Sequence, residues 1–261
     1  MNILYRPEFM RGFGTYKLRG ETLKTVLDHA LNLGYRAIDT AQMYQNEREI
    51  GQVLQHHVVS RSELCITTKV LPENYAANRF MASVEQSLTD LNIEQIDVLL
   101  LHSPPKQDFC ATLGLLEQAQ RQGLTKFIGL SNFSPEQMFK AIDVTSTPLI
   151  VNQVEFHPLL DQSDLLQAAV DTQIPLSSYC SIARGEVLKY PLIQRLAQYY
   201  ARSPAQIILR WILQSGIPSN TMSSDPQRIA ENFAILDFTL AHIHLQQIAE
   251  LKSANYRIVK G

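Results

Sequence analysis

Four side chains in the first half of the sequence have the types that proton transfer to a substrate requires: Asp39, Tyr44, Lys69 and His102. A tyrosine protonates a carbonyl oxygen effectively if its pKa falls from about 10 towards the working pH. A lysine ammonium about 4 Å away would favour the phenolate by roughly 4 kcal/mol at an effective dielectric of about 20. The lysine stays charged inside a fold only beside a carboxylate, which Asp39 can supply. With His102 to orient the substrate oxygen, the set predicts reduction of a carbonyl group by hydride from a cofactor.

Polar side chains end, or directly follow, a series of apolar runs along the sequence. They are Asp39, Lys69, His102, Ser131, Asn132, Gln153 and Tyr179. In a parallel barrel the carboxyl ends of all strands open on one face, where active sites are built. One such residue would mean little, but polar residues on successive runs predict a single polar pocket.

The apolar runs are short enough for strands and alternate with amphipathic stretches that suit helices. The strand-like runs cover residues 37–39, 64–69, 98–102, 127–130, 149–153 and 176–179, with a weaker run near 217–222 and a short one around 14–16 that begins the series. Capping patterns predict helix starts at Ser134, Ser203 and Asp225, each followed by proline, and at Asn46. Eight strands alternating with helices predict an α/β fold, a single (β/α)₈ TIM barrel domain over residues 1–261.

An open, doubly wound dinucleotide fold is the alternative to a closed barrel. That fold requires G-x-G-x-x-G after its first strand, with an acidic residue about 20 positions further on. Gly12-Phe13-Gly14 comes closest, but Lys17 stands where the third glycine belongs. The missing glycine favours the barrel.

Length and composition agree with a barrel, which typically takes about 250 residues. The 261 residues are 45% hydrophobic and 18% charged, which allows a large core and argues against disorder. A formal net charge of −2 gives no electrostatic signal for nucleic acid or anionic lipid. No apolar stretch approaches the roughly 20 residues of a membrane helix, and the start lacks the apolar segment of a signal peptide.

Cysteine and histidine usage gives no sign of a metal centre. Cys65, Cys110 and Cys180 lack metal-ligand spacing and cannot all pair, so we expect reduced thiols and a cytoplasmic protein. His242 and His244 have no third ligand near them in the sequence. We expect a monomer that acts on a small-molecule carbonyl substrate and binds neither nucleic acid nor membrane.

Six segments, in order along the chain, resemble the signatures of the aldo-keto reductase superfamily. They are GYRAIDTAQMYQNE (34–47), ITTK (66–69), IDVLLLHSP (96–104), IGLSNF (128–133), VNQVEFHP (151–158) and RIAENF (228–233). The resemblance extends from Gly12 to about Arg257, and the ordered set is far more specific than any one motif. It implies a NADPH-dependent reductase in which Tyr44 donates the proton, Lys69 and Asp39 support it, and His102 orients the carbonyl.

The same resemblance implies how the cofactor would bind across the barrel mouth. Ser131, Asn132 and Gln153 would hydrogen-bond the nicotinamide carboxamide, and Tyr179 would stack on the ring. Ser223, Arg228, Glu231 and Asn232 would contact the adenosine end. Further expected cofactor contacts are Gly14, Thr15, Tyr16, Ile182 and Met222, and Tyr16 and Ser103 would line the substrate pocket.

Three departures from the family pattern bear on substrate and coenzyme. Ser103 replaces a tryptophan that many members carry after the histidine, which predicts a wider and wetter pocket. Met222 replaces a lysine that faces the adenosine 2′-phosphate, whereas Arg228 can still form a bidentate contact with it. We therefore expect NADPH with reduced discrimination against NADH. The loop from Cys180 to Gly185 lacks the usual Ser-Pro-Leu, as in a bacterial subgroup that includes 2,5-diketo-gluconate reductase B and reduces methylglyoxal.

The substrate class implied by this subgroup is small aldehydes and ketones: 2-oxo-aldehydes, aromatic aldehydes or keto-sugar acids. Longer family members carry a C-terminal loop that shapes the pocket, so the short tail after Arg257 predicts an open, permissive site. The alternative function is a nicotinamide-binding regulatory subunit with little turnover, against which the intact set of four residues argues.

Several other residues have a structural interpretation. Helix capping is sufficient to explain Asn46 and Glu47, and we expect His157 to support the loop that follows its strand. Cys65 is expected as a small buried hydrophobic residue, and Trp211 as a helix-packing residue.

Overall fold

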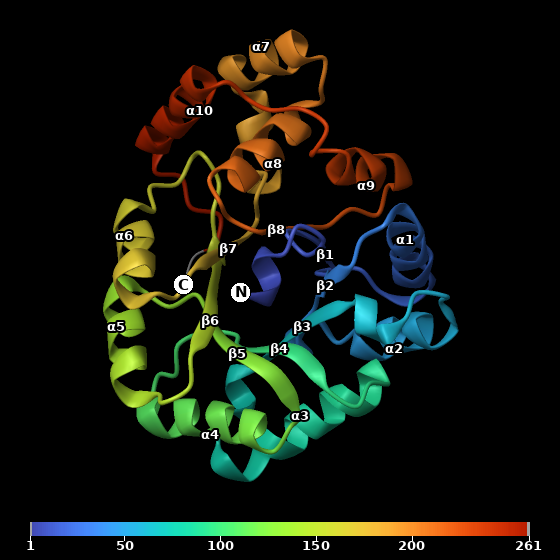
Figure 1. The fold of residues 1–261 in the computed structure, drawn as a ribbon, viewed down its shortest axis with the longest axis vertical. Coiled ribbons are helices and arrows are strands. Elements are labelled where there is room, and N and C mark those ends of the chain that lie inside the picture. The colour runs from blue at the N-terminus through green and yellow to red at the C-terminus, as the bar shows by residue number, and fades with distance from the viewer. Residues whose placement is uncertain (1, 260–261) are drawn as a thin grey trace.

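The computed structural model describes residues 2–259, and the strands among them form a closed parallel barrel in chain order (Figure 1). The strands are β1 (Arg11–Gly14), β2 (Ala37–Asp39), β3 (Cys65–Val70), β4 (Ile96–Leu101), β5 (Thr125–Ser131), β6 (Leu149–Glu155), β7 (Leu176–Tyr179) and β8 (Ser219–Thr221). β8 pairs with β1 and closes the ring. The predicted (β/α)₈ TIM barrel is therefore confirmed.

Most strands lie where the apolar runs placed them, and the first strand is the exception. The runs predicted at 37–39 and 176–179 match β2 and β7. β3, β4, β5, β6 and β8 begin and end within two residues of the predicted runs. The run expected around 14–16 is wrong by about three residues, because β1 ends at Gly14. At Gly12 an added Cβ would meet the side-chain amide of Asn220 on β8, and β1 includes two glycines, which an apolar pattern does not reveal.

Helices enclose the barrel on its outside (Figure 1). They are α1 (Gly20–Leu33), α2 (Glu47–His56), α3 (Ala77–Leu91), α4 (Phe109–Arg121), α5 (Pro135–Val144), α6 (Ser163–Thr172), α7 (Pro191–Tyr200), α8 (Pro204–Gln214), α9 (Pro226–Phe233) and α10 (His242–Ala249). Ser134 and Ser203 form capping boxes with Gln137 and Gln206, and Asp225 accepts from two backbone N–H groups of α9. The three predicted caps are confirmed, each contributing about 1 kcal/mol.

The amino-terminal segment closes the barrel at the end opposite the carboxyl termini of the strands. A short 3₁₀ helix (Ile3–Tyr5) lies within the ring of strands in Figure 1. Ile3, Leu4 and Phe9 pack against the inward-facing side chains of the barrel, including Cys65, which is fully buried as predicted. The interior of the barrel is therefore filled from this end by apolar side chains.

The remaining core lies between the strands and the surrounding helices. Trp211 is 8% exposed, stacks on Phe156 at 5.7 Å between ring centroids, and donates from Nε1 to the carbonyl oxygen of Leu245. It packs α8 against β6 and α10, as predicted. None of the helices between residues 2 and 259 combines the length and hydropathy needed to cross a membrane.

Candidate active site

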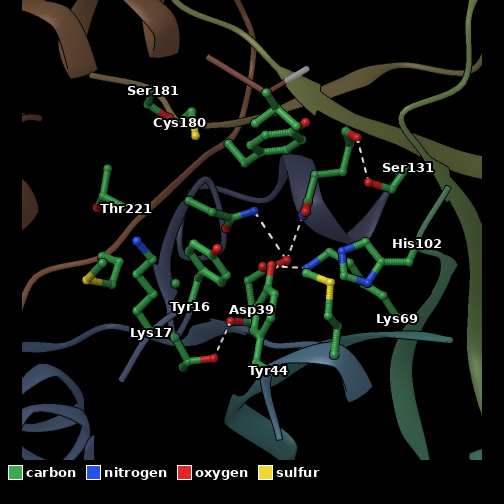
Figure 2. Close-up of a pocket in the computed structure, with 18 of the residues that line it drawn as sticks. Tyr16, Lys17, Asp39, Tyr44, Lys69, His102, Ser131, Cys180, Ser181 and Thr221 are labelled. Carbon is green, nitrogen blue, oxygen red and sulfur yellow. Dashed lines mark hydrogen bonds and ion pairs between the residues drawn. The ribbon is translucent and has the colours of Figure 1, made fainter. Parts of the chain in front are cut away.

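A cavity of about 400 Å³ lies at the carboxyl ends of the strands (Figure 2). Its lining includes most of the predicted site residues, drawn from the ends of the eight strands and from the loops that follow: Gly14, Thr15, Tyr16, Asp39, Tyr44, Lys69, His102, Ser131, Asn132, Gln153, Tyr179, Ile182 and Met222. A volume of this size suits a ligand site, for which about 300–1,000 Å³ is typical. The structure thus brings the residues singled out at the ends of apolar runs into one pocket.

The centre of the cavity floor is a buried ion pair between β2 and β3. Lys69 Nζ lies 2.7 Å from Asp39 Oδ1 and also donates to the carbonyl oxygen of Thr40 at 2.9 Å. Lys69 is 1% exposed and Asp39 is 5% exposed. Asp39 accepts further bonds from Gln153 at 2.6 Å and from Asn220 at 3.5 Å. Although burial opposes the charge, the neighbouring carboxylate raises the pKa of Lys69 above its ordinary value, so the lysine remains an ammonium.

Tyr44 lies over this pair, on the short 3₁₀ helix Gln42–Tyr44 that follows β2. Lys69 Nζ is 5.2 Å from the centroid of the Tyr44 ring. The ring centroids of Tyr44 and Tyr16 are 5.1 Å apart. Burial raises the pKa of Tyr44 above its ordinary value, and the Lys69 ammonium offsets only part of that rise. The lowered pKa expected from the sequence is therefore wrong for this structure, because loss of solvent outweighs the attraction of a lysine whose charge is shared with Asp39. The phenol is fully protonated at neutral pH.

His102 follows β4 and is the second polar group above Lys69. Its ring meets that of Tyr44 edge-on, with 5.9 Å between centroids. Burial and the Lys69 ammonium lower the pKa of His102 to about 3, so the imidazole is neutral at physiological pH. Nδ1 is buried and has no hydrogen-bond partner among residues 2–259. A neutral imidazole can donate a ring N–H to a ligand oxygen without adding a charge.

The side chains expected around the nicotinamide are already linked to one another across β5, β6 and β7. The hydroxyl of Tyr179 donates to Asn132 Oδ1 at 2.6 Å, and Asn132 Nδ2 donates to the carbonyl oxygen of His102 at 2.9 Å. Ser131 Oγ donates to the backbone carbonyl of Gln153 at 2.8 Å. Because Gln153 Nε2 donates to Asp39, this glutamine belongs to the hydrogen-bond set of the ion pair.

Five of the predicted site residues do not line the cavity. Ser103 lies beyond His102, with its backbone N–H and carbonyl both bonded to the hydroxyl of Tyr75. The other four are Ser223, Arg228, Glu231 and Asn232, on the loop after β8 and on α9. The Arg228 side chain is 75% exposed, with its Nε 3.7 Å from Asp225. On this side of the barrel the cavity lining ends at Met222, so these four residues, which follow it in the chain, lie outside the cavity.

The interpretation of Asn46 and Glu47 as helix caps is wrong. Asn46 is fully buried and makes no side-chain capping bond to α2. Glu47 is 7% exposed, and its carboxylate accepts from Thr68 Oγ1 at 2.6 Å and from Ser87 Oγ at 3.2 Å. Burial raises the pKa of the Glu47 carboxyl above its ordinary value. Both side chains turn inwards because the interior offers partners that a solvent-facing cap lacks.

The carboxyl-terminal segment reaches the cavity. Glu155 at the end of β6 accepts from His157 Nε2 at 2.9 Å and from the backbone N–H groups of Ile258 at 2.6 Å and Val259 at 2.8 Å. His157 thus has the supporting role expected from the sequence. Val259 is part of the cavity wall, so the carboxyl-terminal segment contributes to the site on this side.

Eight residues of the cavity lining lie outside the set of site residues predicted from the sequence: Lys17, Met43, Cys180, Ser181, Arg184, Asn220, Thr221 and Val259. Most follow the end of a strand by only a few positions, and that spacing could have identified them. Val259 could not have been found in this way, because a contact between β6 and the tail brings it to the site. Between residues 2 and 259, no group of three or more His, Cys, Asp or Glu side chains could hold a metal ion.

Comparison with known proteins agrees with this geometry. The model of the aldo/keto reductase family matches residues 12–253. Methylglyoxal reductase DkgA of Escherichia coli (strain K12) is 38% identical over 245 residues, which cover 92% of this chain and 88% of the relative. Methylglyoxal reductase DkgB of Yersinia pestis is 34% identical over 255 residues, covering 95% of this chain and 94% of the relative.

Solved structures of other proteins are similar to this chain in both fold and sequence. The crystal structure of a protein provisionally named 2,5-diketo-D-gluconic acid reductase B has a TM-score of 0.93 at 37% identity, covering 97% of this chain and 90% of that chain. A mutant of Gox0644 in complex with NADPH has a TM-score of 0.88 at 30% identity, covering 93% of this chain and 89% of that chain. The resemblance seen in the sequence motifs is confirmed. This chain belongs to the aldo/keto reductase family.

Proposed function

We propose that this protein is a NADPH-dependent carbonyl reductase in which Tyr44 donates a proton to the oxygen of a small aldehyde or ketone. The observation that carries the proposal is the ion pair of Lys69 and Asp39 at 2.7 Å, buried directly beneath a protonated tyrosine and beside a neutral histidine. A buried ion pair is costly to maintain and adds little stability compared with apolar packing. Its place under Tyr44 is best explained by chemistry at that phenol.

The cavity lining suits the nicotinamide and phosphate part of a dinucleotide. Amide and hydroxyl groups at the ends of β5 and β6 suit a carboxamide, and the Tyr179 ring offers an aromatic face. Lys17 and Arg184 also line the cavity and can bind phosphate oxygens. When bound, NADPH supplies the hydride that this chain cannot supply from its own residues. Support for NADPH in particular comes from the Gox0644 complex.

The chain's own residues account for the proton. His102 orients the substrate oxygen through a neutral ring, and Tyr44 transfers its proton to that oxygen as negative charge develops there. The Lys69 ammonium then stabilises the phenolate, and Asp39 keeps that ammonium charged. A raised pKa leaves Tyr44 protonated before the reaction, so the ammonium acts on the product of proton transfer, where it is needed.

We further propose that the substrates are 2-oxo-aldehydes such as methylglyoxal, aromatic aldehydes and keto-sugar acids. The support comes from the names of the relatives, which are methylglyoxal reductases and a 2,5-diketo-D-gluconic acid reductase. The cavity near Tyr44 adds the aromatic ring of Tyr16 and the apolar side chains of Met43 and Val259, which suit the 2-oxo-aldehydes and aromatic aldehydes of this set.

The proposal is tested by following the absorbance of NADPH with purified protein and methylglyoxal, phenylglyoxal or 2,5-diketo-gluconate. We expect oxidation of NADPH that depends on the carbonyl compound. NADH is run in parallel, and we expect it to be used with an affinity within about a thousandfold of NADPH, since Met222 offers no charge to a 2′-phosphate. Tight binding of both coenzymes without turnover of any carbonyl compound would instead favour a regulatory subunit.

A further inference from the structure

Asn46 is a fully buried polar side chain two positions after Tyr44, outside the cavity. Its amide nitrogen donates to the carbonyl oxygens of Thr15 at 2.9 Å and Leu18 at 3.0 Å. Its amide oxygen accepts from Thr40 Oγ1 at 2.8 Å. The side chain therefore joins the loop after β1 to the loop after β2 with three buried hydrogen bonds.

Both of these loops carry parts of the site. The loop after β1 holds Tyr16 and Lys17 against the cavity, and the Tyr16 ring lies 5.1 Å from that of Tyr44. In the loop after β2, Thr40 accepts from Lys69 Nζ through its carbonyl oxygen while its hydroxyl donates to Asn46. Thr40 is thus hydrogen-bonded both to the Asn46 amide and to the ammonium group beneath Tyr44.

We propose that Asn46 is a positioning residue that sets the geometry of Lys69 and Tyr44 through Thr40. A buried donor or acceptor without a partner is costly, so the three bonds of Asn46 hold the two loops in one arrangement. The Asn46 amide touches neither the cavity nor Lys69 and acts only through the backbone that it fixes. The inference rests on the proposed function, since it concerns the groups that transfer the proton.

The test combines Asn46→Ala with Thr40→Val, a nearly isosteric change that removes the hydroxyl and keeps the backbone carbonyl. We expect Asn46→Ala to lower kcat about 10²-fold, because small misplacements of catalytic groups cost that much. KM for the carbonyl compound should change less than about threefold, since the groups concerned act in the transition state. Thr40→Val should lower kcat about tenfold by loosening the same link.

The double variant distinguishes positioning from general structural damage. If Asn46 acts through Thr40, the double variant has the kcat of Asn46→Ala within about twofold, because the second change removes a link already lost. If the two changes instead acted independently on the structure, their fold-losses in kcat would multiply in the double variant, and that result would overturn the proposal. Equal kcat for Asn46→Ala and the wild type, measured per folded molecule, would also overturn the proposal.

Glu117→Ala is the matched control. Glu117 is 7% exposed on α4, and its carboxylate accepts from the backbone N–H groups of Ser146 and Thr147, both at 2.8 Å. These residues precede β6, at the end of the barrel opposite the cavity. This variant should lose thermal stability and keep its kcat. If Asn46→Ala fails to fold, Thr40→Val alone still decides the proposal, because unchanged kcat in that variant contradicts it.

The wild type separates this inference from the proposed function. A wild-type protein that binds NADPH and does not turn over would contradict the proposed function. Wild-type turnover with no loss in either single variant would contradict only the role of Asn46.

Discussion

Two segments that follow strands of the barrel differ sharply in how firmly they are held. Residues 40–47, which we call the Tyr44 turn, are held by buried side chains: Thr40 and Asn46 are fully buried and Glu47 is 7% exposed. In residues 222–233, which we call the Met222 segment, Ile229 and Asn232 are buried, but most of the side chains from 222 to 228 are exposed to solvent. Met222 is 39% exposed and the Arg228 side chain 75% exposed.

The difference in burial between the two segments agrees with the roles proposed for them, proton transfer for the Tyr44 turn and binding of the adenosine end of the cofactor for the Met222 segment. Proton transfer depends on the placement of a few atoms, and the turn that carries the proposed donor, Tyr44, is fixed by several buried hydrogen bonds. Holding the far end of a dinucleotide requires charge and reach, which long exposed side chains provide at little structural cost. Of the two segments, the one that carries Tyr44 has the buried hydrogen bonds of its side chains.

The largest expected effect comes from the ion pair beneath the Tyr44 turn. Lys69→Met should lower kcat about 10³-fold, because the phenolate loses its stabilising charge. It should also destabilise the fold by about 3–5 kcal/mol, because Asp39 is left buried without its partner. Steady-state kinetics and chemical denaturation measure the two effects.

A double variant, Asp39→Asn with Lys69→Met, separates stability from catalysis. With both charges removed, most of the stability should return, whereas kcat should remain low. A double variant that is stable and also fully active would show that the ion pair has no part in the reaction.

The next largest effect concerns Glu47, whose carboxylate holds the end of the Tyr44 turn to β3 and α3. Glu47→Ala should lower the free energy of unfolding by about 1–3 kcal/mol, since Thr68 and Ser87 lose a buried acceptor. Arg228→Ala, in the open segment, should change it by less than about 0.5 kcal/mol. Equal losses in the two variants would contradict the contrast between the segments.

The charge of Glu47 gives a pH dependence of known sign. Its folded-state pKa is raised, so the folded protein holds a proton that the unfolded chain releases, and the stability contributed here falls as the pH rises between the two pKa values. Glu47→Gln should remove this part of the pH dependence. Denaturation curves of the variant and the wild type on both sides of that interval measure it, and identical slopes would contradict the raised pKa.

A smaller effect is expected in the Met222 segment. Met222→Lys should strengthen NADPH binding about tenfold relative to NADH, because an ammonium is placed near the expected 2′-phosphate. Arg228→Ala should weaken NADPH binding with little effect on NADH. Coenzyme affinities from fluorescence titration measure both, and kcat should stay within about twofold because this segment is remote from Tyr44.

The smallest effect is an expected lack of change at His102. Because its pKa lies at about 3, the ring should remain neutral at about pH 5, where an ordinary histidine is largely protonated. Nitrogen NMR of histidine-labelled protein reports the charge of the ring directly. A protonated His102 at that pH would show that the site is better solvated than the structure indicates.

The sequence predicted much of the fold, because strand and helix periods, proline and capping residues are local signals. Ser134, Ser203 and Asp225 cap the helices they were expected to cap. Asn46 has the same kind of side chain in the same kind of position, yet it turns inwards to Thr15 and Leu18. A local pattern cannot distinguish a cap from a buried link, because the partners lie 28 to 31 positions away in the chain.

The members of the site were also largely predictable, and their electrostatics were not. Residue types at strand ends placed Asp39, Lys69 and His102 in one pocket, because the topology of a parallel barrel brings these ends together. The direction of the Tyr44 pKa shift was predicted wrongly, since it depends on how much solvent the finished fold excludes. Val259 was missed because a long-range contact with Glu155 places it.

The role of Tyr44 is tested most directly by Tyr44→Phe, which removes the phenolic hydroxyl and keeps the ring that packs against Tyr16 and His102. The measurement is the single-turnover rate of NADPH oxidation with methylglyoxal, together with NADPH affinity by fluorescence titration on the same preparation. We expect the rate to fall by about 10²–10⁴-fold, as for loss of a general acid, with unchanged NADPH affinity. A variant that binds NADPH normally and turns over at the wild-type rate would contradict the assignment of Tyr44 as the proton donor.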